Sequence, residues 1–165
     1  IHTNSATGAI PRLIDMGVEP FLLVSTLRAV VGQRLVRRLA DDKKEEYKLT
    51  KAEREKVTSE ENFEAAFKAL QEEKVIKATT KLESIPFARP KGGPETEGAY
   101  KSRIGIHEVL HVSSAIRELI IKGGNSDQIE AQAKSEGMLT MLEDGIYKSA
   151  KGITSLEEVL RAVSE

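Results

Sequence analysis

The feature that most constrains the fold is a highly charged segment between two more apolar parts of the chain. From residue 41 to residue 61, 14 of 21 residues are charged, with both signs mixed, and the apolar exceptions are Tyr47, Leu49, Ala52 and Val57. Such a segment cannot line a large core, because charged side chains are almost never fully buried unless they are paired. We therefore expect a satellite module in mid-chain and a separate core built from the flanking parts.

The middle segment also contains the signals of a small insert. Thr50 and Glu53 have the spacing of a capping box, and Ser59 precedes a second helical pattern. The apolar residues of that pattern are Phe63, Ala66, Phe67 and Leu70. Residues 74–87 are richer in β-branched side chains and predict a strand. The glycine- and proline-rich stretch 89–94 predicts the loop that closes the insert.

The part before the charged segment predicts two helices and a strand. Apolar side chains at helical spacing predict a short helix over residues 6–16, which Gly17 would end. Pro20 suits the first turn of a second helix, which we expect to be mostly buried and to run on through residues 30–31. Residues 33–39, bracketed by Gly32, predict a strand.

The part after the insert predicts one strand and then a helical end. Residues 102–112 alternate like a strand that returns to the first core. The remaining residues show helical spacing, and the glycines that punctuate the helix ends are Gly123, Gly137 and Gly152. The expected helix starts are Ser113 or Ser114, Asn125 with Gln128, and Thr154 with Glu157.

Composition excludes several function classes. With 25 basic and 26 acidic residues the formal charge is -1, so no net field favours nucleic acid. The chain has no cysteine, which excludes a disulfide framework and thiol redox chemistry. Its longest apolar stretch, residues 18–31, is shorter than the ~20 residues that a membrane helix needs. The chain begins at Ile1 without a leader pattern, so we interpret it as a piece of a longer or processed protein.

Three stretches carry a family resemblance: residues 2–17, starting His-Thr-Asn and ending Met-Gly; residues 33–39, Gln-Arg-Leu-Val-Arg-Arg-Leu; and residues 100–108, Tyr-Lys-Ser-Arg-Ile-Gly-Ile-His-Glu. They resemble the C-terminal half of the secretion ATPases that drive type II secretion and type IV pilus assembly. The resemblance implies an α/β fold, here an α+β fragment of a RecA-like P-loop ATPase. Residues 1–40 and 99–112 would belong to its core, 41–98 would be an insert in place of a zinc-binding module, and 113–165 a C-terminal helical subdomain.

The same resemblance implies the function of the parent protein. A family member would be a cytoplasmic homo-hexamer, peripheral at the inner membrane, that uses ATP and magnesium to power secretion or pilus assembly through an integral platform protein. Hydrolysis needs a phosphate-binding loop and a carboxylate near the magnesium ion. The chain contains no Gly-x-x-x-x-Gly-Lys-Ser/Thr motif. We therefore expect this fragment not to hydrolyse ATP by itself.

The resemblance also assigns roles to single residues. His2 would lie near the γ-phosphate and sense or orient it, Arg12 and Arg103 would lie near the interface between adjacent subunits, and Arg34 beside the nucleotide pocket. Arginine suits phosphate because its planar fork stays charged and bonds bidentately. The alternatives are an ordinary terminal histidine for His2 and, for each arginine, a solvated side chain in a surface ion pair, which we favour at residues 37–38.

The sequence departs from the family at the zinc module. Tetrahedral structural zinc commonly takes four thiolate or imidazole ligands held in pairs. The family's four cysteine positions correspond here to Ala40, Lys43, Gly92 and Glu95. None of these can supply a thiolate, and His107 and His111 lie on an expected strand rather than on one helix face, so we expect no zinc. We expect apolar burial to hold the insert instead, as a marginal, mobile module.

A second function class stays open from the sequence. The chain would then be a non-catalytic interaction module that binds an inner-membrane platform or regulatory protein. The charged segment or the closing helices would form its surface, with charge steering the encounter more than strengthening it. A third reading, an unrelated soluble α+β domain, requires all three stretches to match in order by chance.

Overall fold

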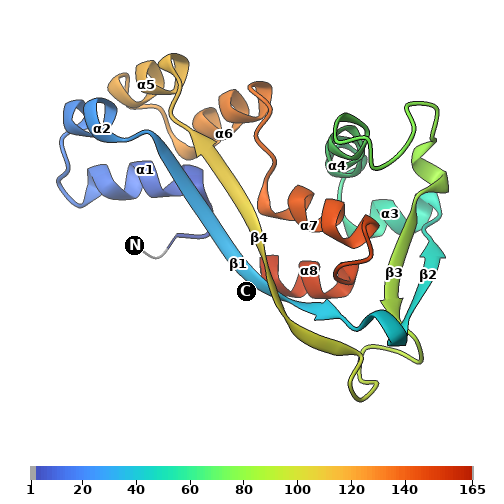
Figure 1. The fold of residues 1–165 in the computed structure, drawn as a ribbon. Coiled ribbons are helices and arrows are strands. Elements are labelled where there is room, and N and C mark those ends of the chain that lie inside the picture. The colour runs from blue at the N-terminus through green and yellow to red at the C-terminus, as the bar shows by residue number, and fades with distance from the viewer. Residues whose placement is uncertain (1–2, 165) are drawn as a thin grey trace. The chain divides into compact units, whose positions relative to one another are not determined.

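The computed structural model describes residues 3–164, apart from the side chains at positions 60 and 61. Helices and strands are mixed along the chain (Figure 1), which confirms the expected α+β character. The helices are α1 (Ala6–Asp15), α2 (Pro20–Thr26), α3 (Lys51–Val57), α4 (Glu60–Glu72), α5 (Ser114–Ile121), α6 (Ser126–Ser135), α7 (Met141–Ala150) and α8 (Leu156–Ser164). The strands are β1 (Ala29–Leu39), β2 (Lys44–Lys48), β3 (Pro86–Pro90) and β4 (Tyr100–His111), with 3-10 turns η1 (Asp41–Lys43) and η2 (Leu82–Ser84). Among residues 3–164, no helix has the length and apolar character needed to cross a membrane.

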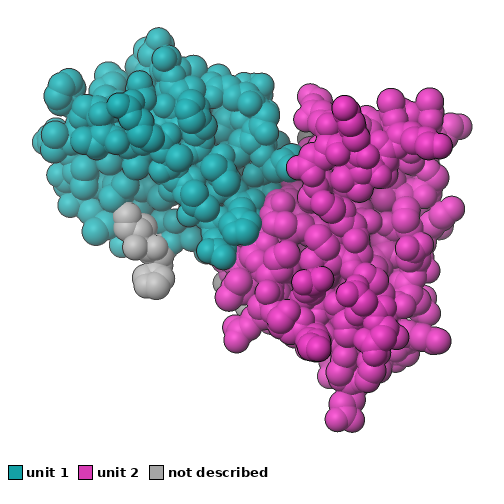
Figure 2. Space-filling view, viewed as in Figure 1, with its two compact units in different colours: residues 1–33, 107–140 teal, residues 34–106, 141–165 magenta. Residues whose placement is uncertain are grey.

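The chain divides into two compact units, coloured separately in Figure 2. Unit 1 contains residues 1–33 and 107–140, and unit 2 contains residues 34–106 and 141–165. The boundaries fall within β1 and β4, which pair with each other as a two-stranded sheet. The closing helices are shared, because α5 and α6 belong to unit 1 while α7 and α8 belong to unit 2. The three-part division implied by the family resemblance stays a prediction.

Unit 1 is built from helices around one apolar core. Helix α6 packs against both α1 and α5, and α2 packs against α5. The buried core residues are Ala6, Ile10, Leu23, Leu110, Val112, Ile116, Ile120, Ile129 and Ala133. The predicted first helix is confirmed, and Gly17 follows it with φ 89°, a left-handed conformation that glycine adopts without strain.

The second predicted helix is wrong in its length and burial. Helix α2 stops at Thr26, and the valines at 30–31 belong to β1. The hydroxyls of Ser25 and Thr26 both donate to the carbonyl of Leu22, so side chains compete for helix acceptors where the helix ends, and β-branched valines then favour a strand. Phe21 is 72% exposed, and Leu23 is the one buried residue of α2.

Unit 2 combines strands with four helices around a core that the insert and the C-terminal helices share. Helix α7 packs against α4, α8 and β3. The larger cluster contains Leu49, Phe63, Ala66, Leu70, Ile85, Phe87, Ile146, Tyr147 and Leu156. A smaller cluster contains Val36, Ile106, Met141, Val159 and Ala162. Most of the apolar residues of the expected insert helix, Phe63, Ala66 and Leu70, are therefore buried, whereas Val75 of the same insert is 44% exposed.

The strand predicted over residues 74–87 is wrong for most of its length. Strand β3 begins at Pro86, and its antiparallel partner is the charged segment β2, with Tyr47 opposite Phe87. Residues 74–81 form turns instead, starting with Lys74 in a left-handed conformation at φ 57°. The sequence does not predict β2, because Tyr47 is the one apolar side chain of this strand and its charged neighbours remain accessible to solvent.

Most predicted helix starts are confirmed. Thr50 with Glu53 and Asn125 with Gln128 both form complete capping boxes, and of the two serines offered for α5, Ser113 is the cap. The pairing of Thr154 with Glu157 is wrong by one residue. The Ser155 hydroxyl accepts the N–H of Glu158 at 3.3 Å, because the Thr154 hydroxyl is used elsewhere and donates to the carbonyl of Arg37 at 2.8 Å.

Candidate functional site

The segment in front of α1 is held in a defined turn. His2 lies outside the described residues, so the description starts with Thr3, whose hydroxyl donates to the carbonyl of Ser5 at 3.0 Å. Ser5 is the N-cap of α1, and its hydroxyl accepts the N–H of Gly8 at 3.0 Å. The residues that directly follow His2 are therefore turned and capped by their own side chains.

A carboxylate from β4 completes the start of α1. Glu108 is 3% exposed, and its Oε1 accepts the N–H of Ala6 at 2.8 Å. Helix starts expose unpaired N–H groups and a partial positive charge, so a carboxylate is favourable there. Glu108 is the last residue of the third motif stretch, but the sequence assigns it no role. Its signal is an acidic residue at an inward position of an alternating strand, between Ile106 and Leu110, which are both fully buried.

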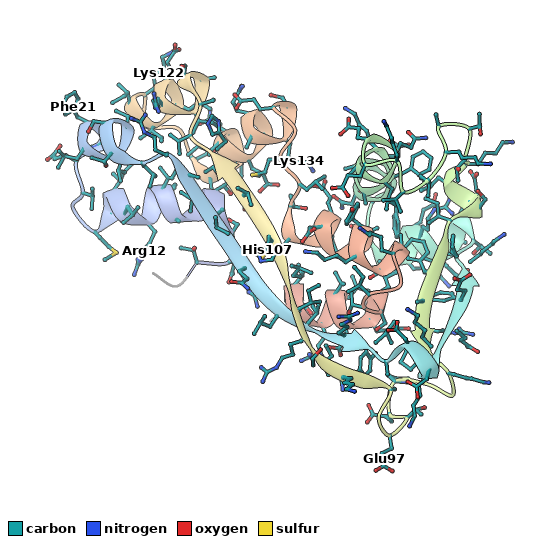
Figure 3. All side chains as sticks on the ribbon, in the orientation of Figure 1. Arg12, Phe21, Glu97, His107, Lys122 and Lys134 are labelled. Atoms are coloured by element: carbon teal, nitrogen blue, oxygen red, sulfur yellow. The ribbon has the colours of Figure 1, made fainter. Side chains whose placement is uncertain are left out.

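Two of the arginines assigned by the resemblance project into solvent. Arg12 extends outward from α1 (Figure 3), and Arg103 is exposed on β4. Within residues 3–164, neither guanidinium has an ion-pair or hydrogen-bond partner, so the surface ion pair that was the alternative reading does not hold either of them. Arg34 is half-buried on β1. Arg12 belongs to unit 1, whereas Arg34 and Arg103 belong to unit 2.

Arg37 forms an ion pair at the surface of unit 2, as expected, and its side chain is 44% exposed, but its carboxylate partner is buried. Its guanidinium donates to Glu158 Oε1 at 2.5 Å and lies 4.2 Å from the ring centre of Tyr100. The N–H of Arg37 donates to Oε2 of the same carboxylate, which also accepts from Arg161, both at 3.1 Å. Glu158 is 2% exposed, so this network joins α8 to β1 through a charge that is paired on several sides.

The Glu158 network predicts a pH-dependent stability. Burial alone raises the pKa of Glu158, but hydrogen bonds from the side chains of Arg37 and Arg161 and from the Arg37 N–H outweigh burial and lower this pKa from 4.5 to about 2. A carboxyl with a lower pKa in the folded state stabilises it above the unfolded pKa, and this stabilisation is lost as the pH falls from about 4.5 towards 2. Glu158→Gln should lower the free energy of unfolding near neutral pH and flatten its decline in that window. Urea unfolding at several pH values measures both, with exposed Glu157→Gln as the control; equal slopes in the two variants would contradict the prediction.

The four positions that correspond to zinc ligands in the family do not fit a zinc ion. They offer one carboxylate and one ammonium group but no thiolate or imidazole. Among residues 3–164, no three His, Cys, Asp or Glu side chains gather as metal ligands would, and His107 and His111 both lie on β4. We derive no chemistry through a metal here, and a zinc-free module stays a prediction.

Hydrogen bonds connect the two chain segments that carry those positions. The N–H of Ala40 donates to the carbonyl of Ala99 and the N–H of Lys91 donates to the carbonyl of Lys43, both at 2.9 Å. The Lys43 ammonium reaches the carbonyl of Glu97, at the tip of the loop seen in Figure 3, at 2.7 Å. Main-chain hydrogen bonds and one lysine therefore join the two ends of the insert.

Comparisons with known proteins bear on the whole chain. The family model described as "Type II/IV secretion system protein" matches residues 1–161. Three similar proteins are a "Type II secretion system ATPase E" of Vibrio cholerae (37% identical) and a "Type IV pilus assembly ATPase PilB" from each of Pseudomonas aeruginosa (35%) and Thermus thermophilus (38%). Each match covers 100% of this chain but 29%, 26% and 17% of the relative, respectively. The chain thus spans less than a third of the length of these relatives.

Proposed function

The chain belongs to the type II/IV secretion system protein family, and from that premise we propose that it is the C-terminal part of the motor domain of a secretion-type ATPase. The observation that carries the proposal is similarity along the whole chain to proteins named as secretion and pilus assembly ATPases. The motor hydrolyses ATP with magnesium and drives type II protein secretion or type IV pilus assembly. A phosphate-binding loop and magnesium carboxylates are supplied by residues upstream of this chain, so the fragment alone is inactive.

In this proposal the fragment supplies groups that act around the nucleotide. Residues 1–40 and 99–112 belong to a RecA-like core, residues 41–98 are the zinc-free insert, and residues 113–165 are the C-terminal subdomain. His2 orients or senses the γ-phosphate, and Arg34 lies beside the nucleotide. The solvent exposure of Arg12 and Arg103, without an ion pair in residues 3–164, supports their role as arginines offered to a neighbouring subunit.

The proposed assembly follows from the same premise. The working protein is a homo-hexamer in the cytoplasm, peripheral at the inner membrane, and it acts on an integral platform protein of the secretion or pilus system. In a hexamer, guanidinium groups that have no ion pair within residues 3–164 can meet their partners on the next subunit.

The test compares ATP hydrolysis by this chain with hydrolysis by the same chain extended upstream to include a phosphate-binding loop, at equal concentrations with magnesium. We expect turnover in the extended chain and none in the fragment, because the loop and the magnesium ligands position the phosphates. The matched control for contaminating ATPases is a variant of the extended chain in which the lysine of the phosphate-binding loop is replaced. Inactivity of the extended chain would contradict the proposal and favour an interaction module that binds its partners without catalysis.

A further inference from the structure

We propose that Glu108 is a positioning residue for residues 3–5, which directly follow His2, holding them to strand β4 through the first N–H of α1. The inference rests on the proposed function, because it takes the role of His2 at the nucleotide from that proposal. It adds how the chain next to His2 is anchored. Glu108 does not touch the reacting atoms in this proposal. It acts through Ala6 and the short turn that precedes α1.

The first argument is the place of Glu108 in its strand. Ile106, Glu108 and Leu110 follow one another on the inward face of β4, Val112 continues the alternation just after the strand, and all four are 3% exposed or less. The three neighbours are apolar, as a core position favours. A buried carboxylate costs free energy unless it is hydrogen-bonded, and an apolar residue would fill the position as well. Packing alone therefore does not account for glutamate here.

The second argument is what the carboxylate holds. Oε1 of Glu108 lies 2.8 Å from the N of Ala6, across 102 residues of sequence, and Ala6 is itself 1% exposed. By contrast, the hydrogen bonds of Thr3 and Ser5 described above are local and fix the shape of the turn rather than its place. The contact between Glu108 and Ala6 thus ties the turn to the sheet four residues after His2.

The third argument concerns the effect of losing this tie. If His2 acts on a phosphate, its position depends on the residues that anchor the chain beside it. A displacement of about 1 Å at a reacting group can cost roughly 100-fold in rate. Nucleotide binding depends on the upstream loop and would change far less. Loss of the Glu108 tie should therefore lower kcat while leaving the KM for ATP nearly unchanged.

The experiment uses the full-length protein and compares Glu108→Leu, Glu108→Gln and Leu110→Val. We expect Glu108→Leu to lower kcat by roughly 10- to 100-fold with little change in KM. Hydrogen exchange of the peptide covering residues 3–10 should become faster in the same variant. Glu108→Gln keeps an oxygen that accepts the Ala6 N–H and should retain most of the wild-type kcat. Leu110→Val weakens the same face of β4 but leaves the bond intact, so it should lower the melting temperature and keep kcat.

Two results would overturn the inference: a folded Glu108→Leu protein with wild-type kcat, or a Leu110→Val protein that loses kcat in step with its melting temperature. If Glu108→Leu does not fold, Glu108→Asp decides, because its side chain is one methylene too short to reach Ala6. A normal melting temperature with reduced kcat in Glu108→Asp supports the tie, and wild-type kcat overturns it. Absence of turnover in the wild-type protein would be a different failure, that of the proposed function and of this inference with it.

Discussion

Arg103→Ala in the full-length protein should lower ATP turnover by about 1,000-fold, the size of effect seen when an arginine supplied to a phosphoryl-transfer site is removed. Arg103 is exposed on β4 and has no ion-pair partner within residues 3–164, so its removal should cost little folding stability. Nucleotide affinity should change much less than turnover, because the guanidinium would act on charge that develops in the transition state. Steady-state hydrolysis and equilibrium nucleotide binding, measured on one preparation, separate the two effects.

Two further variants make the Arg103 prediction specific. Arg38→Ala removes an exposed arginine from β1 and should leave turnover near the wild-type value, since Arg38 is the solvated side chain that the sequence predicts. Arg103→Lys keeps the positive charge but not the planar fork, and it should restore only a small part of the activity. Unchanged turnover in Arg103→Ala, or an equal loss in Arg38→Ala, would refute the inter-subunit role.

The elements that the sequence predicted well have local causes. Helix α1 has apolar residues at helical spacing and a glycine after its last turn, and α6 has a complete capping box at Asn125. Such signals act within one or two turns and need no distant partner. The same holds for β4, whose inward residues alternate from Ile106 to Leu110.

Two elements that the sequence missed or misplaced depend on distant residues. Strand β2 is mostly charged and exists because it pairs with β3, with the rings of Tyr47 and Phe87 6.4 Å apart. The start of α8 moved by one residue because the Thr154 hydroxyl bonds to the carbonyl of Arg37, 117 residues away in sequence. Local sequence patterns cannot predict such contacts.

In the candidate site, too, local motifs predicted some residues, and distant contacts determine the rest. The motif stretches led to the family, which the comparisons then showed, and they singled out His2, Arg12, Arg34 and Arg103 as residues to test. They include Glu108 but gave it no role, because its partner is a backbone N–H of α1, which is 102 residues away in the sequence. Nor did they separate Arg37, which is held by Glu158, from the solvated Arg38. The family can be recognised from local motifs, whereas the contacts that position the motifs require the fold.

Gly145→Ala should destabilise unit 2 by about 2 to 3 kcal/mol, although the same change in an exposed helix interior usually stabilises by roughly 1 kcal/mol. A β-carbon at position 145 would lie 2.2 Å from Cγ1 of Val159, because α7 and α8 approach closely at this glycine. Val159 is fully buried in the smaller apolar cluster, so its side chain has no free space to move into. Thermal unfolding should show a fall of roughly 4 to 12 °C for a chain of this size.

The sign of the Gly145 effect is what distinguishes close packing from helix propensity, and a second substitution tests it. Val159→Ala removes Cγ1 and Cγ2, the two atoms nearest to the added methyl group, and leaves Cβ at 3.2 Å, a tight but tolerable distance. Alone it should destabilise by about 1 to 3 kcal/mol through the cavity that it creates. In the double variant the new methyl group fills part of that cavity. The stability loss of the double variant should therefore be smaller than the sum of the two single losses by about 1 to 3 kcal/mol. Strict additivity would mean that the loss in Gly145→Ala does not come from contact with the Val159 side chain, and would refute this explanation.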